Sequence, residues 1–315
     1  MRPAPAAWVV VGPGDDAAVV EPERNALEVL TTDALVEGVH FDPAFTPPEA
    51  VGHRALAVTL SDLAAMGASP RSVLLSLVLP PALPLADFVA LLDGFDALAR
   101  AHGIALVGGN ITRSPGPLVV DVTAIGSVRR RRALTRTGAR PGDEVWVSGE
   151  IGAAAAGLQW LAAGAPAGHA GMASCRSAFL MPRPRVRLGQ LLGRNRAASS
   201  CIDLSDGLAD GLHQLAAASG AGIEVDGAAV PVPAAAAAWF ESRGQDALIA
   251  AAAGGDDYEL LFTVRPRHRG RFATARRQAG DLRLTRIGVV TAGAGVSMAR
   301  GGAAVPVPAG FEHFQ

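Results

Sequence analysis

Hydrophobic residues in the first half of the chain fall into short apolar runs that alternate with longer segments of helical periodicity. Residues 8–11 and 27–32 are short and rich in β-branched side chains, which predicts strands. Pro48 and Glu49 then give a helix-start signal, and Gly67 gives a stop. Between them, apolar residues recur with a helical period at Val51, Leu56, Leu60, Leu63 and Met66. A buried helix is therefore expected from about residue 48 to Met66.

The same alternation continues to about residue 128. Strands are predicted at 72–79 and 118–128, a helix at 85–101, and a short strand at 104–107 that runs into a turn at 108–110. The order of strands and helices predicts an α/β or α+β domain.

A polar, basic segment at 129–142 separates this half from the next, so we predict domains at 1–132 and 133–315. The second half repeats the mixed pattern. Its predicted strands lie at 144–149, 223–225, 258–264, 283–290 and 296–299. One helix is predicted to begin near residue 153 and a second to end near residue 196. Two more are predicted at 207–218 and 269–279. The expected fold is a two-domain α/β (α+β) protein.

Composition excludes several classes of function. The chain has 315 residues, 50% of them hydrophobic, and a formal net charge of −1, which gives no overall drive toward nucleic acid or anionic membranes. Its positive charge comes from arginine, because the sequence contains no lysine, and this excludes a Walker phosphate loop. Two cysteines without metal-ligand spacing favour a reducing cytoplasm, and the alanine run at 234–238 is too short to span a membrane.

Small acidic clusters recur beside glycine, serine or threonine. The first is Gly12-Pro13-Gly14-Asp15-Asp16, where two glycines free the backbone to turn. The others contain Thr31-Thr32-Asp33, Ser61-Asp62, Asp203-Leu204-Ser205-Asp206 and Gly254-Gly255-Asp256-Asp257. Magnesium takes oxygen ligands and keeps several waters, so carboxylates together with substrate phosphates are its usual ligands. The collection favours metal-dependent phosphate chemistry.

Three of these clusters also have a simpler interpretation. Asp203 and Asp206 could be caps of the following helix, and residues 254–257 could be an ordinary turn before a strand. Taken alone, Asp62 fits a solvated aspartate in the last turn of its helix. A hydrolase triad has no support, because neither Ser61 nor Ser205 lies in a Gly-x-Ser-x-Gly sequence.

Six motifs together resemble the thiamine-monophosphate kinase family. They are GPGDDAAVV at 12–20, TTDALVEGVHF at 31–41, RALAVTLSDLAAMGA at 54–68, ALTRTG at 133–138, IDLSDGL at 202–208 and GGDDYELLF at 254–262. The family is related to aminoimidazole ribonucleotide synthetase, selenophosphate synthetase and a hydrogenase-maturation protein. The resemblance implies phosphoryl transfer from ATP to thiamine monophosphate with several magnesium ions. It further implies a homodimer in which the N-terminal sheets form a barrel, with ATP in a cleft between the domains.

The resemblance also assigns roles by position. It implies a metal set of Asp16, Thr31, Thr32, Asp33, Asp62, Asn110, Asp203 and Asp206, with Asp203 and Asp206 as catalytic residues. Gly109, Asn110, Arg136 and Ser205 would bind ATP, while His40, Asp256 and Phe311 would contact the thiamine part.

The chain departs from the family pattern at several positions. Asn110 stands where the family usually has Asp, Asp256 where it prefers Glu, Thr59 where it prefers Asn, and Ala153 where it often has Asp. An amide offers one oxygen without charge, which weakens a metal site. Two alternatives therefore stay open: a paralogue that acts on another acceptor, and a non-catalytic protein that binds nucleotide or thiamine phosphate.

Overall fold

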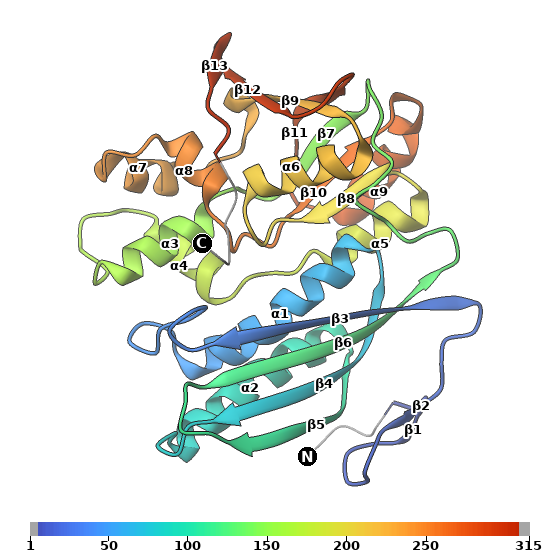
Figure 1. The fold of residues 1–315 in the computed structure, drawn as a ribbon, viewed down its shortest axis with the longest axis vertical. Helices are drawn as coiled ribbons and strands as arrows, with labels where there is room; N and C mark the ends of the chain where they lie inside the picture. Colours follow the sequence, from blue (N-terminus) through green and yellow to red (C-terminus); the bar gives the residue numbers. More distant parts are fainter. Residues whose placement is uncertain (1–5, 309–315) are drawn as a thin grey trace. The chain divides into compact units, whose positions relative to one another are not determined.

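The structure, a computed structural model, describes residues 6–308 (Figure 1). Contacts within the chain divide it into two compact units. Unit 1 contains Met1–Leu63 and Ala68–Arg131, and unit 2 contains Ala64–Gly67 and Arg132–Gln315. In the described part of the chain, no helix is both long and apolar enough to cross a membrane.

Unit 1 is a four-stranded sheet with two helices on one face (Figure 1). The strand order is β3 (Ala26–Val36), β6 (Val119–Arg129), β4 (Ser69–Leu79) and β5 (Ala105–Arg113), and only β4 and β5 run parallel to each other. The helices are α1 (Pro48–Ala65) and α2 (Leu85–His102). Strand side chains alternate between the two faces, so Leu35, Val73 and Val122 point into the core with the buried side of α1. A separate two-stranded ribbon of β1 (Val9–Val11) and β2 (Val19–Val20) precedes this sheet.

Unit 2 is built on a seven-stranded sheet of order β13-β12-β9-β11-β7-β10-β8. Its strands are β7 (Glu144–Ser148), β8 (Ser200–Asp203), β9 (Gly222–Asp226), β10 (Leu260–Val264), β11 (Leu284–Thr291), β12 (Val296–Arg300) and β13 (Ala303–Val305). Its helices are α3 (Ala153–Ala162), α4 (Met172–Leu180), α5 (Val186–Asn195), α6 (Leu208–Ser219), α7 (Ala234–Ser242), α8 (Ala247–Ala253) and α9 (Arg269–Ala279), with short 3₁₀ turns at Gly227–Ala229 and Pro266–His268. Side chains from β7, β9, α6 and α7 meet in one hydrophobic core.

The mixed α/β class and the two-part organisation are confirmed, and several local predictions are wrong. Residues 108–110 are not a turn but part of β5, because Gly109 and Asn110 pair with β4. The strand predicted at 27–32 is confirmed, and the structure extends it to Ala26–Val36. β10 begins at Leu260, two residues later than expected. Tertiary pairing overrides the local turn preference of glycine and asparagine at these places.

The sequence pattern also missed the short elements β2, β8, β13, α4, α7 and α8. Helices α7 and α8 are alanine-rich, so their apolar residues show no clear helical period.

Candidate active site

Three candidate metal ligands meet on the helix-facing side of the unit 1 sheet. Thr31 and Asp33 lie two residues apart on β3, so their side chains share a face. The Thr31 hydroxyl donates a hydrogen bond to Oδ2 of Asp62, which projects from the last turn of α1. Asp62 is therefore half-buried against the sheet and is not the solvated aspartate that the residue alone suggests.

The carboxylate of Asp33 lies in surroundings where a cation would stabilise its ionised form. Its Oδ2 is buried and has no hydrogen-bond partner among the described residues. Burial and the negative charges of Asp62 and Asp121 raise the pKa of Asp33 to about 6, against an opposing hydrogen bond from Thr59. An unpaired buried carboxylate oxygen beside two further carboxylates is costly unless a cation neutralises it.

These oxygen atoms fit a magnesium ion that is completed by other ligands. Within residues 6–308, no group of three or more His, Cys, Asp and Glu side chains is arranged to hold a metal by itself. Magnesium retains several waters and is usually held by one or two carboxylates together with substrate phosphates, so a partial protein site agrees with its chemistry. Asp33, Asp62 and Thr31 would hold the ion in unit 1.

The raised pKa of Asp33 predicts a specific pH dependence. Because its folded-state pKa of about 6 exceeds the ordinary 3.8, the folded protein favours the protonated carboxyl. That contribution to stability is present below pH 4 and is lost as the pH rises through about 6 in metal-free protein. Magnesium should reverse the trend, since only the ionised carboxylate binds it well. We therefore expect magnesium to raise the melting temperature more at pH 7 than at pH 5, as measured by differential scanning calorimetry.

The Asp33→Asn variant is the control, because its side chain does not titrate. An equal magnesium-induced shift at both pH values in the unmodified protein would show that Asp33 is not part of a cation site.

Two other predicted metal ligands, Thr32 and Asn110, lie on the opposite, open face of this sheet. The Thr32 hydroxyl contacts the Thr123 hydroxyl at 3.0 Å and Oδ1 of Asp121 at 3.4 Å. Asn110 is exposed on the edge strand β5, in the cross-strand row that contains Ser76 and Asp121. The side chain of Thr32 therefore faces away from those of Thr31 and Asp33.

Gly109 precedes Asn110 at a point where two backbones approach closely. A Cβ at Gly109 would lie 1.9 Å from the carbonyl oxygen of Leu75, so no other residue fits without movement of β5.

Two further predicted residues of unit 1 lie in loops. Asp16 is exposed after the turn between β1 and β2, where its N–H donates to Oδ1 of Asp15 at 2.9 Å. His40 lies in the turn after β3, and its Nδ1 accepts the N–H of Val36 at 3.0 Å. That bond fixes the ring and leaves Nε2 as the protonated nitrogen of the neutral imidazole.

In unit 2 the structure brings two acidic segments, 203–206 and 254–257, into direct contact. Asp203 ends β8, where it is buried opposite Leu260, while Ser205 is exposed and Asp206 half-buried. The N–H of Asp256 donates to the carbonyl of Ser205 at 2.7 Å, and the N–H of Tyr258 donates to that of Leu204 at 3.0 Å. The two segments therefore hold each other in place.

Neither simple interpretation of these segments is sufficient. The N-cap of α6 is Gly207, so neither Asp203 nor Asp206 occupies that position. Residues 254–259 form an irregular segment without regular secondary structure, with positive φ values at Asp256 and Tyr258. Gly255 allows the close approach, because a Cβ there would lie 2.5 Å from the carbonyl oxygen of Ser205.

Arg136 is oriented by a chain of side-chain hydrogen bonds in the same unit. Its guanidinium donates to Oε1 of Gln214, and Nε2 of Gln214 donates to Oδ2 of Asp210 on the first turn of α6. The planar guanidinium can bind a phosphate through two hydrogen bonds.

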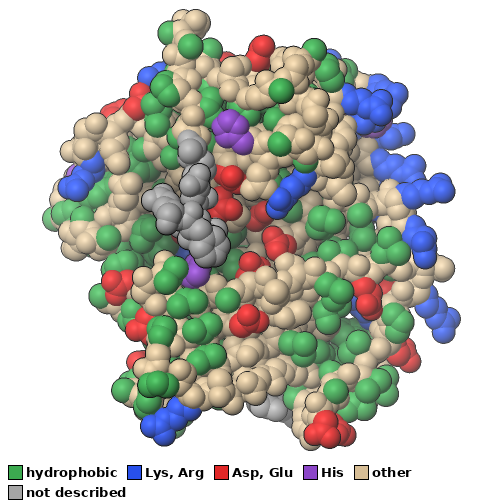
Figure 2. Space-filling view, viewed as in Figure 1, with side chains coloured by type: hydrophobic (Ala, Val, Ile, Leu, Met, Phe, Trp, Pro, Cys, Tyr) green, Lys and Arg blue, Asp and Glu red, His purple; other side chains and the backbone are tan. Residues whose placement is uncertain are grey.

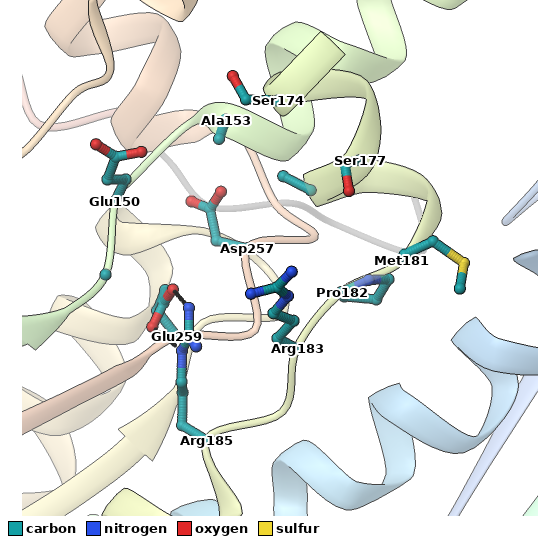
Figure 3. A pocket seen from close by; sticks show the side chains of 12 residues that line it. Glu150, Ala153, Ser174, Ser177, Met181, Pro182, Arg183, Arg185, Asp257 and Glu259 are labelled. Atoms are coloured by element: carbon teal, nitrogen blue, oxygen red, sulfur yellow. Dashed lines mark hydrogen bonds and ion pairs between the residues drawn. The ribbon is translucent and has the colours of Figure 1, made fainter. Parts of the chain in front are cut away.

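A cavity of about 370 Å³ lies beside these segments, entirely within unit 2 (Figure 3). It is lined by Gly149, Glu150, Ala153, Ser174, Ser177, Ala178, Met181, Pro182, Arg183, Arg185, Asp257 and Glu259. Figure 3 shows the Arg183 guanidinium pointing into it. Its volume falls in the range of small-molecule pockets.

The base of the cavity is an ion pair between the partly exposed Arg185 and the buried Glu259. Arg185 donates from Nε to Oε2 of Glu259 at 2.6 Å and from its terminal nitrogen to Oε1 (Figure 3). The Ser148 hydroxyl also donates to Glu259 and itself accepts the N–H of Leu260 at 2.9 Å. The network links β7, β10 and the segment before α5.

Asp257 joins this cavity to helix α3. Its carboxylate accepts the N–H of Gly152 at 2.8 Å, which satisfies an otherwise unpaired donor at the start of the helix. Burial raises the pKa of Asp257 well above its usual value, although part of the side chain reaches the cavity.

Residue roles that sequence reasoning missed follow from tertiary contacts. Asp121 lies in a mostly apolar strand, and only the β3–β6 pairing brings it near Thr32 and Asp33. Arg185 and Glu259 are far apart in sequence. Tyr258 is the single tyrosine of the chain, and this rarity is the one sequence signal that could have drawn attention to it. Phe311 lies outside the described residues.

Comparison with known proteins assigns both units to one family. The profile of the AIR synthase related protein, N-terminal domain, matches residues 14–128, and that of the AIR synthase related protein, C-terminal domain, matches residues 140–300.

Individual relatives narrow this assignment. Thiamine-monophosphate kinase of Escherichia coli K12 is 39% identical over 315 residues, covering 97% of this chain and 92% of its own. The crystal structure of thiamine-monophosphate kinase from Stenotrophomonas maltophilia K279a matches with a TM-score of 0.84 and 41% identity, covering 95% of this chain and 93% of its own. The structure of AaThiL complexed with AMPPCP and TMP matches with a TM-score of 0.81 and 34% identity, covering 96% and 91%. The chain therefore belongs to the thiamine-monophosphate kinase family of AIR synthase related proteins.

Proposed function

We propose that this protein is a thiamine-phosphate kinase that transfers the γ-phosphoryl group of ATP to thiamine monophosphate, giving ADP and thiamine diphosphate. The observation that carries the proposal is similarity over nearly the whole chain to thiamine-monophosphate kinases, one of which is solved with AMPPCP and TMP. ATP is the co-substrate and magnesium the metal. The cytoplasm is the proposed location, in keeping with two free, buried cysteines.

The proposed mechanism is direct in-line transfer, in which the protein mainly positions reactants and stabilises charge. A phosphate oxygen of thiamine monophosphate forms the new bond to the γ-phosphorus as the bond to ADP breaks. Magnesium, when bound, neutralises negative charge on the phosphates. Its proposed ligands come from both units: Asp16, Thr31, Thr32, Asp33, Asp62, Asn110, Asp203 and Asp206.

The remaining roles belong to groups that bind the two substrates. Gly109, Asn110, Arg136 and Ser205 contact ATP, and the Gln214–Asp210 chain supports Arg136 in the orientation that a phosphate requires. His40, Asp256 and Phe311 contact the thiamine part, whose flat rings an aromatic side chain can stack against. Asp203 and Asp206 act as catalytic residues through the metal, with ATP bound jointly by both units.

A homodimer formed through the open face of the unit 1 sheet is part of the proposal. Large apolar side chains are exposed on this face of its strands, among them Leu30 at 65% and Leu74 at 37%. Figure 2 shows hydrophobic side chains at the surface where Figure 1 draws these strands. Burying such a patch against a second copy would remove it from water. One chain has a mass of 32.1 kDa, and sedimentation equilibrium should give twice this value.

The direct test is product formation. Purified protein is incubated with ATP, magnesium and thiamine monophosphate, and thiamine diphosphate is separated from the starting ester. Thiamine diphosphate should appear in step with ADP. ATP binding without this product would overturn the kinase proposal and favour another acceptor or a binding role, which Asn110 motivates.

Restoring a charge at position 110 separates catalysis from simple binding. Asn110→Asp adds a carboxylate oxygen on an exposed strand position, so we expect tighter magnesium binding and about tenfold faster turnover at limiting magnesium. Steady-state rates across a magnesium titration measure both effects. Thr112→Asp, also exposed on β5, is the matched control. No gain at position 110, or an equal gain in the control, would remove Asn110 from the metal set.

A further inference from the structure

Tyr258 has a backbone conformation that is unusual for a large aromatic residue. It is 7% exposed, its φ is 49°, and that of Asp256 is 66°, so two residues without glycine's freedom adopt the left-handed region within three positions. Aspartate tolerates this region because its short side chain can bond locally, whereas tyrosine rarely adopts it. Backbone strain of this kind persists only where the surroundings enforce it, and it concentrates at functional sites.

The enforcing contacts tie the segment to the loop that carries Ser205 and Asp206. The N–H of Asp256 donates to the Ser205 carbonyl at 2.7 Å, and the N–H of Tyr258 donates to the Leu204 carbonyl at 3.0 Å. Both bonds require the irregular backbone of this segment. Their effect is to fix residue 256 relative to the loop that carries two predicted ATP and metal ligands.

The Tyr258 hydroxyl completes this arrangement by donating to Oδ1 of Asp256 at 2.9 Å. A carboxylate on a short side chain retains freedom of rotation about its terminal bonds. A hydrogen bond to one of its oxygens restricts that rotation and sets the direction of the other. A fixed carboxylate can accept a hydrogen bond from an amino group and attracts a cationic ring.

We propose that Tyr258 is a positioning residue for the phosphate acceptor, and that it acts by orienting the Asp256 carboxylate toward the acceptor's heterocyclic part. The inference rests on the proposed function, since thiamine monophosphate has both an amino group on its pyrimidine and a cationic thiazolium. In this role Tyr258 acts through Asp256 and not by contact with the reacting phosphates. Its influence is on acceptor recognition rather than on ATP binding.

The kinetic test is Tyr258→Phe, which removes the hydroxyl and keeps the ring that fills the site. Loss of a hydrogen bond to a charged group should lower kcat/KM for thiamine monophosphate by about tenfold, mostly through KM, while KM for ATP stays within about twofold. In an Asp256→Ala background the same change should have no further effect. Ser242→Ala removes a hydroxyl that donates to the Trp239 carbonyl elsewhere in unit 2, and should leave both constants unchanged.

A spectroscopic test does not depend on turnover. Because Tyr258 is the only tyrosine, protein labelled with 3-fluorotyrosine gives a single ¹⁹F resonance from this position. Thiamine monophosphate alone should shift that resonance, and Asp256→Ala should abolish the shift.

The outcomes separate this inference from the kinase proposal. If thiamine diphosphate is formed but Tyr258→Phe leaves KM for the acceptor unchanged and the resonance does not move, the positioning role is wrong and the activity stands. If no thiamine diphosphate is formed but the resonance shifts only when Asp256 is present, the kinase assignment fails and the binding role stands. Equal rises in KM for ATP and acceptor would show a merely structural role and overturn the inference.

Discussion

Replacement of Asp206 by alanine is expected to reduce kcat by roughly 10²- to 10³-fold while the protein remains folded. Removing a single group that stabilises transition-state charge has an effect of this size in other enzymes. Asp206 lies in a half-buried loop before α6, outside the hydrophobic core of unit 2, so its loss should not prevent folding. Thiamine diphosphate formation measures the rate, and circular dichroism checks the fold.

Magnesium binding provides a second measurement for the same variant. We expect Asp206→Ala to lower the affinity for Mn²⁺, used as a paramagnetic substitute for magnesium, in the presence of nucleotide. Asp281→Ala is the matched control, since Asp281 is exposed in the loop between α9 and β11. Turnover within tenfold of the unmodified protein would remove Asp206 from the metal set.

Replacement of Glu259 by alanine is expected to lower the free energy of unfolding by about 2–4 kcal/mol, because it leaves the partly buried Arg185 guanidinium without its partner. The side chains of Glu259 and Arg185 are 5% and 22% exposed, and Ser148 also donates to the lost carboxylate. Urea denaturation followed by tryptophan fluorescence measures the change. The cavity should lose its ordered base at the same time, since Arg185 and Glu259 both line it.

Two further variants distinguish the loss of a charged partner from the loss of side-chain packing. Glu150→Ala breaks the exposed pair with Arg283 in the same unit, whose side chains are 50% and 59% exposed, and should cost less than about 1 kcal/mol. Replacing both Arg185 and Glu259 with leucine should recover much of the loss, because neither charge is then left unpaired. A Glu259→Ala effect no larger than that of Glu150→Ala would mean that the pair does not stabilise unit 2.

The arginines on unit 2 illustrate how little local composition says about a site. Basic side chains gather along one side of this unit, where Figure 1 places α9 (Figure 2). Arg269 pairs with the buried Glu144 at 2.6 Å, so part of this charge holds the helix to β7. The arginines near the candidate site are instead Arg136, Arg183 and Arg185, which come from loops.

The sequence by itself determined the mixed α/β class, the helices α1, α2, α6 and α9, and the family. Long amphipathic periods and capping residues are local signals, and the acidic motifs are contiguous, so both can be read without tertiary contacts. The same locality explains the error at 108–110, where turn-forming residues are held in a strand by pairing with β4.

Only the tertiary structure decided which of these residues act together. Strand alternation puts Thr31 and Asp33 on the face with Asp62 and turns Thr32 toward Asp121. Backbone contacts between 204–205 and 256–258 place Tyr258 against Asp256, and the Arg185–Glu259 pair joins residues 74 positions apart. The physical reason is that burial, unpaired charge and left-handed backbone are consequences of packing between distant segments, and no local sequence pattern determines them.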